Sequence, residues 1–218
     1  MASKQITSTA GVIVLCTLAL IFGLYLSLSN NGFFAPKIKS EEIEGFFWPN
    51  QKRIEPFTMV DQNNSDFTLE HFRGKWSFLF FGYTHCPDIC PITMQQMKEA
   101  NGKLLDQHPE LESTIQMIFV SVDGERDTPE HLKNYVEFFG DFIGLTGSEV
   151  QLQGLTTQLG VPYSIEPHEP GNQNYLVEHS GAIFLISPQG MLASIYQPPF
   201  TPQGVSDRFQ QILQFLDQ

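Results

Sequence analysis

The stretch YTHCPDICPITM at residues 83–94 holds two cysteines, Cys86 and Cys90, separated by three residues. Such a pair can form a structural disulfide, exchange electrons with another thiol pair, or bind a metal ion. As a disulfide it would close a very short loop and constrain little of the unfolded chain. Only one other cysteine, Cys16, is present, whereas disulfide-stapled scaffolds carry more. We therefore expect a functional pair.

The prolines of this stretch predict where the second cysteine lies. Pro91 disfavours a helical conformation at Cys90 and is itself suited to the first helical position. A helix is therefore expected over residues 92–107, with Cys90 near its start. Unpaired backbone N–H groups at a helix start favour a thiolate. A lowered thiol pKa would serve both thiol exchange and metal binding, so it does not separate the two uses.

A metal site would need a third ligand. Two thiolates suit a soft ion such as Cu(I), and an added imidazole would also accommodate Cu(II). Zinc in a structural site normally has four protein ligands. The histidines that could supply the third ligand are His71, His85, His108, His131, His168 and His179.

His179 is the preferred candidate because it directly precedes the apolar run GAIFLIS, which should lie beside the cysteine-bearing strand. The sequence alone leaves open whether it is a ligand. His108 and His131 fall on polar helix faces, where surface roles are expected. His71 and His168 fall in charged loops. The side chain of His85 is expected to diverge from that of its neighbour Cys86.

The elements that would position these residues alternate along the chain. Apolar runs predict strands at residues 76–83, 115–123, 181–187 and 191–197, after an N-terminal pair at 56–61 and 66–72. Helices are expected after residue 91, from residue 128, over 148–160 and over 202–216. This order predicts an α/β fold with a mixed sheet, and reactive residues at the carboxyl end of a central strand.

Residues 10–28 contain no charged residue and no proline, and their number is close to the ~20 that a membrane-spanning helix needs. No clear cleavage pattern follows, which favours an uncleaved anchor over a signal peptide. We expect a tail at 1–9, a transmembrane anchor at 10–29, a linker at 30–53 and a domain at 54–218. The formal net charge of -12 makes nucleic acid an unsuitable partner.

Three segments resemble the SCO/SenC family: YTHCPDICP, SVDGERDTPEHL at 121–132 and NYLVEHSGAIFLISPQG at 174–190. The resemblance implies a thioredoxin-like mixed sheet flanked by helices, behind one N-terminal transmembrane helix. It also implies one copper ion, Cu(I) or Cu(II), bound by Cys86, Cys90 and His179. The expected location is a bacterial inner (cytoplasmic) membrane, with the soluble domain on the periplasmic or extracytoplasmic side. The implied partner is subunit II of cytochrome c oxidase, with another copper chaperone as a candidate donor.

Three residues extend or depart from the family pattern. Asp88 matches a family residue thought to tune the site, although it could simply cap the following helix. Glu178 stands where the family commonly has Asp, and Gly124 where it commonly has Pro. Neither departure removes a ligand.

Two functions compete. The first is a metallochaperone that delivers copper to the oxidase or prepares its copper centre. The second is a thiol-disulfide reductase that keeps the oxidase's copper-site cysteines reduced, with Cys86 and Cys90 as the redox pair. Thioredoxins place a cis-proline opposite the reactive cysteines, where this chain has His179, which favours the metal. A peroxidase that uses Thr84 or Arg126 is disfavoured, because Thr84 is not at the expected spacing from Cys86.

Overall fold

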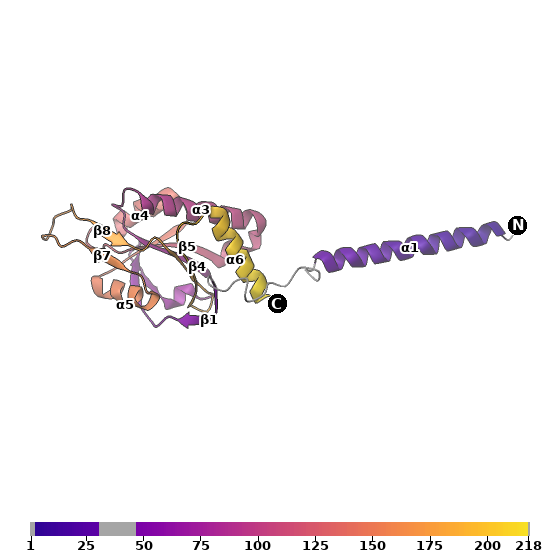
Figure 1. Ribbon diagram of the computed structural model, residues 1–218, viewed down its shortest axis with the longest axis horizontal. Coiled ribbons are helices and arrows are strands. Elements are labelled where there is room, and N and C mark those ends of the chain that lie inside the picture. The colour runs from indigo at the N-terminus through magenta and orange to yellow at the C-terminus, as the bar shows by residue number, and fades with distance from the viewer. Residues whose placement is uncertain (1–2, 31–46, 218) are drawn as a thin grey trace.

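The computed structural model describes residues 3–30 and 47–217, and its main element is an eight-stranded mixed sheet (Figure 1). The order across this sheet is β1-β10-β9-β4-β5-β6-β2-β3. Its strands are β1 (Phe47–Arg53), β2 (Thr58–Asp61), β3 (Asp66–Thr68), β4 (Trp76–Gly82), β5 (Ile115–Ser121), β6 (Phe142–Thr146), β9 (Ile183–Ile186) and β10 (Met191–Tyr196). A two-stranded sheet is formed by β7 (Tyr163–Ile165) and β8 (Val177–His179).

Helices cover both faces of the large sheet, namely α3 (Ile89–Gln107), α4 (Pro129–Phe139), α5 (Glu149–Leu159) and α6 (Pro202–Leu216). The short 3-10 helices are η1 (Leu69–Phe72) and η2 (Pro109–Thr114), and the N-terminal helix is α1 (Ser3–Asn30). One core contains buried residues of α3, α4 and α6, and the other contains those of α5. In Figure 1, α3, α4 and α6 lie on one side of the sheet and α5 on the other.

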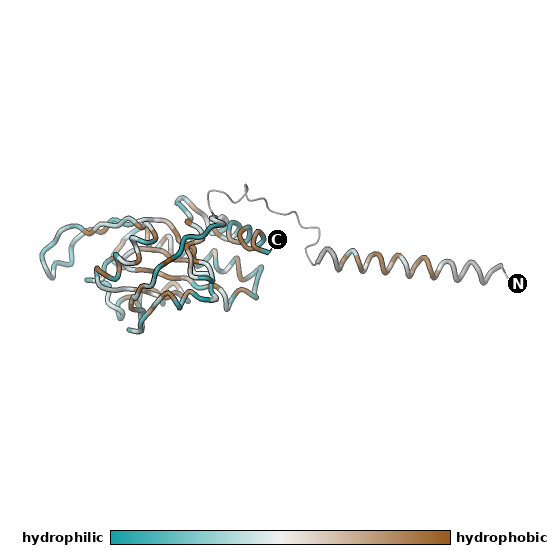
Figure 2. Tube along the Cα trace, turned by 90° about the horizontal axis from the view of Figure 1, so that it is seen from below, coloured by the Kyte–Doolittle hydropathy of each residue, from teal (hydrophilic) through white to brown (hydrophobic). Residues whose placement is uncertain are grey.

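Strand β4 is buried at every position because both of its faces are covered. Phe78 and Phe80 point into the core with α3, whereas Leu79 and Phe81 point into the core with α5. The strand pairs in parallel with β5 and antiparallel with β9. Figure 2 shows hydrophobic residues gathered in the strands and hydrophilic residues along the outer loops. The α/β fold with a mixed sheet, predicted from the sequence, is confirmed.

The predicted linker was wrong at its C-terminal end. Residues 47–53 form β1, an edge strand antiparallel to β10, and Phe47 is buried in the core. A proline at position 49 argues against a strand in a sequence reading, but an edge strand tolerates one. Strand β6 and the small β7–β8 sheet were not predicted from the sequence. Residues 31–46 of the expected linker lie outside the described residues.

Helix α1 forms where the sequence predicts a helix, and its residues 11–26 are exposed. Within residues 3–30 and 47–217, no helix is both long and apolar enough to cross a membrane. The transmembrane anchor expected over residues 10–29 is therefore not confirmed.

Candidate metal centre

The two cysteines lie where β4 ends and α3 begins. Helix α3 starts at Ile89, so Cys90 is in its first turn and Pro91 follows it there. The helix therefore begins earlier than predicted, because a proline in the first turn removes an N–H group that has no helical partner anyway. Asp88 occupies the N-cap position but its side chain makes no capping hydrogen bond. The capping role considered for Asp88 is thus absent.

Both thiols are free, and they differ in exposure. Cys90 is fully buried, whereas Cys86 is half-buried and packs against both cores. Gly82, the last residue of β4, makes room for the Cys90 sulfur. A Cβ atom at position 82 would lie 2.6 Å from Cys90 Sγ and 2.9 Å from Phe119 Cε2. Because real Cβ contacts are not that short, the position of this sulfur depends on a glycine at the strand end.

His179 is the last residue of β8, and its Cα is paired with that of Tyr163 on β7. Its Nε2 atom lies 3.2 Å from Cys90 Sγ. Its Nδ1 atom lies 3.0 Å from the carbonyl oxygen of Ser180, which can only accept, so Nδ1 carries the proton. In the neutral ring the lone pair of Nε2 then faces the sulfur. A metal-binding histidine is oriented in the same way, by a hydrogen bond from its other nitrogen.

Burial controls the protonation of this pair. It lowers the pKa of His179, which keeps the imidazole neutral and ready to bind a metal. It also raises the pKa of the Cys90 thiol, with a smaller contribution from Cys86. The lowered thiol pKa expected at the helix start is therefore wrong for Cys90, because loss of water outweighs the helix N-terminus. A metal ion would have to displace the thiol proton.

Aromatic rings hold the histidine in place. The His179 ring packs edge-to-face against Phe80, with centroids 5.8 Å apart, and against Tyr83 at the same separation. Both rings belong to the β4 segment that leads into the cysteines. The imidazole is thus packed against the element that carries its sulfur neighbours.

The loop after β5 anchors the cysteine segment through Asp127, whose side chain is fully buried. Asp127 accepts hydrogen bonds from the Thr84 amide at 2.9 Å, the Thr84 hydroxyl at 2.5 Å and the Ser121 hydroxyl at 2.6 Å. These bonds tie the chain two residues before Cys86 to the end of β5. Thr84 is therefore occupied as a structural residue, which removes the support considered for a peroxidase.

The same loop anchors the chain that leads to His179. Arg126 forms a buried ion pair with Asp123 and donates to the carbonyl oxygens of Gln173 at 3.1 Å and Tyr175 at 3.0 Å. Its guanidinium also lies over the Tyr175 ring, 3.6 Å from the centroid, and the Tyr175 hydroxyl donates to Asp123 at 2.6 Å. We call residues 121–128 the bridging loop, because it holds both halves of the site.

The positioning roles of Gly82, Asp123 and Asp127 were not predicted from the sequence, and Arg126 was expected only in connection with peroxide chemistry. The signal was present in SVDGERD, where a buried strand runs directly into three acidic residues and one arginine. Polar residues at the carboxyl end of a central strand indicate a site or its support.

Of the six histidines, His179 is brought to the cysteines. The ligand atoms of Cys86, Cys90 and His179 all lie within 4.8 Å of one another. Two sulfurs and one imidazole nitrogen form a soft donor set that fits a copper ion.

The remaining histidines have other contacts. His71 accepts from the Thr68 amide and stacks on Phe67, and His108 pairs with Glu110. His168 was expected in a solvated loop, but its ring stacks on Tyr175, 3.7 Å between centroids, and is mostly buried. His85 and His131 lie together on the surface.

The two departures from the family pattern lie beside the site. Glu178 is exposed and its carboxylate accepts from the Ser164 hydroxyl at 3.3 Å. A Cβ atom at Gly124 would collide with the carbonyl oxygen of Gly147. A proline at position 124 is therefore incompatible with the path of this loop.

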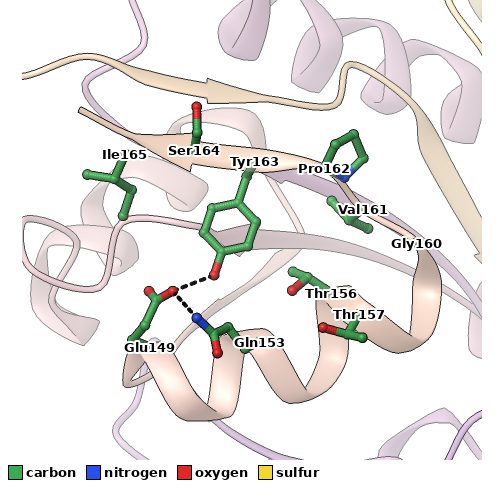
Figure 3. A pocket seen from close by; sticks show the side chains of 10 residues that line it. All are labelled: Glu149, Gln153, Thr156, Thr157, Gly160, Val161, Pro162, Tyr163, Ser164 and Ile165. Carbon is green, nitrogen blue, oxygen red and sulfur yellow. Dashed lines mark hydrogen bonds between the residues drawn. The ribbon is translucent and has the colours of Figure 1, made fainter. Parts of the chain in front are cut away.

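His179 lines a cavity, so the candidate metal centre can be reached from the surface. A cavity of about 350 Å³ is lined by His179, Glu178, the β7 residues Tyr163 and Ser164, and Pro162 just before them. A larger one of about 840 Å³ lies between α5 and β7 (Figure 3). There the Tyr163 hydroxyl and the Gln153 amide both donate to Glu149 at 2.8 Å. No cysteine or histidine lines the larger cavity, so it is not the metal centre.

Known proteins share both the sequence pattern and the fold. The SCO1/SenC family profile matches residues 49–214. An SCO2-like protein of Rickettsia prowazekii is 34% identical, covering 94% of this chain and 98% of the relative.

Two copper-bound crystal structures resemble the chain. That of Arabidopsis thaliana ScoI is 32% identical with a TM-score of 0.65, over 73% of this chain and 98% of that one. That of yeast Sco1 is 28% identical with a TM-score of 0.69, over 74% and 88%. The predicted thioredoxin-like arrangement is thereby confirmed, and the chain belongs to the SCO1/SenC family.

Proposed function

We propose that this protein binds one copper ion through Cys86, Cys90 and His179 and supplies it to the copper centre of cytochrome c oxidase. The observation that carries the proposal is the cluster of two thiols and one imidazole, with Nε2 of His179 3.2 Å from Cys90 Sγ. The copper-bound Arabidopsis and yeast relatives support the identity of the ion.

The site suits transfer of the ion as well as binding. Three protein ligands leave a copper ion open to a further ligand from an acceptor. Cys86 is half-buried and His179 borders an open cavity, so an acceptor can approach from that side. Copper can then pass by exchange of one ligand at a time.

The identity of the acceptor rests on the family resemblance. Subunit II of cytochrome c oxidase is the proposed recipient, and another copper chaperone is the proposed donor. Membrane attachment and a periplasmic location stay predictions, and copper binding by the domain does not depend on them.

Copper titration of the full chain tests the ligand set. We expect one ion at this three-ligand site, and we expect His179→Ala to weaken binding there by a factor of ~100, since one of three ligands is lost. The spectrum of the Cu(II) form should show thiolate-to-copper charge transfer in the wild type. His108→Ala, which changes a histidine paired with Glu110, is the control and should bind as the wild type does. Unchanged affinity in His179→Ala would remove the three-ligand site.

The thiol-disulfide reductase is the alternative, and it would use Cys86 and Cys90, whose sulfurs lie within 4.8 Å of each other, as the redox pair. The chain would be mixed with an oxidised dithiol peptide and the released thiols counted. Turnover that survives His179→Ala but is lost in Cys86→Ser supports the reductase. Copper binding lost in both variants, without turnover in the wild type, supports the chaperone.

A further inference from the structure

A second group of side chains that can bind a metal includes His85 of the cysteine loop. His85 Nδ1 is 3.7 Å from Asp127 Oδ1, and the rings of His85 and His131 stack with centroids 5.3 Å apart and planes 11° apart. The ligand atoms of these three residues lie within 4.8 Å of one another. We propose that His85, Asp127 and His131 form a second metal site, specific for Cu(II).

The carboxylate of this group is fixed before any ion arrives. Asp127 is fully buried and held by Thr84 and Ser121, as described above. Among residues 3–30 and 47–217, the ion-pair partner recorded for Asp127 is the imidazole of His85. A carboxylate oxygen accepts more than one bond, so Oδ1 can bind an ion while it keeps the Thr84 hydroxyl. A buried carboxylate without a lysine or arginine partner gains from a nearby cation.

The two imidazoles are positioned by their backbones and open to solvent. His85 belongs to the cysteine loop and its side chain is 41% exposed. His131 lies in the first turn of α4, where its backbone amide donates to the cap residue Thr128. Ligands about 2 Å from one ion lie at most about 4 Å apart. The rings therefore need to move by roughly 1 Å and to turn about χ2, a broad torsion for histidine.

The donor atoms select the oxidation state. Two imidazoles and one carboxylate are harder than the two thiolates of the neighbouring site, and sites of nitrogen and oxygen donors suit Cu(II). Among divalent first-row ions, Cu(II) also binds such a set most tightly. The two sites would thus prefer different oxidation states of copper. The sulfurs would bind Cu(I), and the surface imidazoles would bind Cu(II). No cysteine takes part, so this inference stands apart from the proposed function.

The test uses the full chain with Cys16→Ser, Cys86→Ala and Cys90→Ala, which removes every thiol. Titration with Cu(II) alone, followed by electron paramagnetic resonance, should show one bound ion with hyperfine structure from two nitrogens. Adding His131→Ala should weaken binding at least tenfold and leave at most one nitrogen. Adding His108→Ala should change neither quantity, because His108 has a carboxylate partner but no second imidazole beside it.

Equal binding with and without His131→Ala overturns the site, and so does an equal loss in the His108→Ala control. If the thiol-free chain does not fold, the same comparison is made in the wild-type background by counting bound Cu(II). His131→Ala should then hold one Cu(II) ion fewer per chain than the wild type. The same count in both chains would contradict the proposal. Both histidines are exposed, so thermal unfolding of the single variants should match that of the parent.

Discussion

The two halves of the thiolate site are built very differently. Cys86 and Cys90 follow β4, a strand of the large sheet that is buried at every position, and Cys90 lies in the core itself. His179 instead ends a three-residue strand of a separate two-stranded sheet, whose partner strand β7 has no fully buried residue. The cysteine half thus depends mainly on core packing, whereas the histidine half combines ring contacts with Phe80 and Tyr83 with the polar contacts of the bridging loop.

The bridging loop connects the two halves of the site. Through Asp127 it holds the cysteine half, and through Asp123 and Arg126 it holds the segment that leads to His179. Breaking the ion pair of the bridging loop should therefore displace the histidine half and weaken copper binding. Overpacking the core should displace the cysteine half and weaken copper binding as well.

The largest effect is expected from Arg126→Met. It leaves Asp123 buried and unpaired, and removing one partner of a buried pair costs about 3–5 kcal/mol. It also releases the carbonyls of Gln173 and Tyr175, so copper affinity should fall as well. Thermal unfolding and copper titration measure the two effects.

The double variant Asp123→Asn with Arg126→Met separates the effect on stability from the effect on copper affinity, since it leaves no unpaired buried charge. Stability should recover in part while copper affinity stays low. Full recovery of copper affinity in the double variant would show that Arg126 does not position the histidine half.

The cysteine half is tested by Gly82→Ala. The new methyl group would meet the Cys90 sulfur and the Phe119 ring, and overpacking of this kind costs about 1–3 kcal/mol. The displaced sulfur should weaken copper binding. Gly102→Ala is the matched control, because its Cβ has open space on an exposed part of α3 and should stabilise the helix by roughly 0.5–1 kcal/mol. Equal copper affinity in both variants would refute the role of Gly82.

A smaller effect is expected from Thr84→Val. It removes a hydroxyl that donates to the buried Asp127 carboxylate, and a hydrogen bond to a charged group contributes about 1.5–3 kcal/mol. Thr114→Val removes a hydroxyl bonded to the neutral Leu111 carbonyl and should cost about 1 kcal/mol. Urea unfolding compares the two. A larger loss for Thr114→Val would contradict the account of the cysteine anchor.

The smallest perturbation is alkylation of the metal-free chain with iodoacetamide. Only a thiolate reacts, and burial raises the pKa of Cys90, so its thiol stays protonated through pH 8. The half-buried Cys86 should be modified before Cys90 at that pH, and the exposed Cys16 serves as the accessible reference. Mass spectrometry of peptides gives the order. Faster modification of Cys90 would mean that the first turn of α3 is open.

The sequence predicted the cysteine half well because its signals are local. A continuous apolar run, two cysteines and flanking prolines predict a buried strand followed by a helix start, and the structure has both. The start of α3 was placed too late because Pro91 was assigned to the first helical position. The predicted lowering of the Cys90 thiol pKa was wrong, because the sequence does not show that this sulfur is buried against Gly82.

The histidine half could be inferred only from the resemblance and from the position of His179 before an apolar run. Strands β7 and β8 are three residues long and half-exposed, so neither shows a periodic pattern. Tyr175 forms hydrogen bonds with Arg126 and Asp123, which lie about fifty residues before it in the sequence. Such contacts depend on the assembled sheet, and no local pattern predicts them.

X-ray absorption at the copper edge tests the central claim most directly. The full chain loaded with one equivalent of Cu(I) is compared with the same preparation of His179→Ala. The wild type should show two sulfur ligands and one imidazole, and the variant should keep both sulfurs and lose the imidazole. An imidazole signal that persists unchanged in His179→Ala, or a wild-type site without sulfur, would contradict the account.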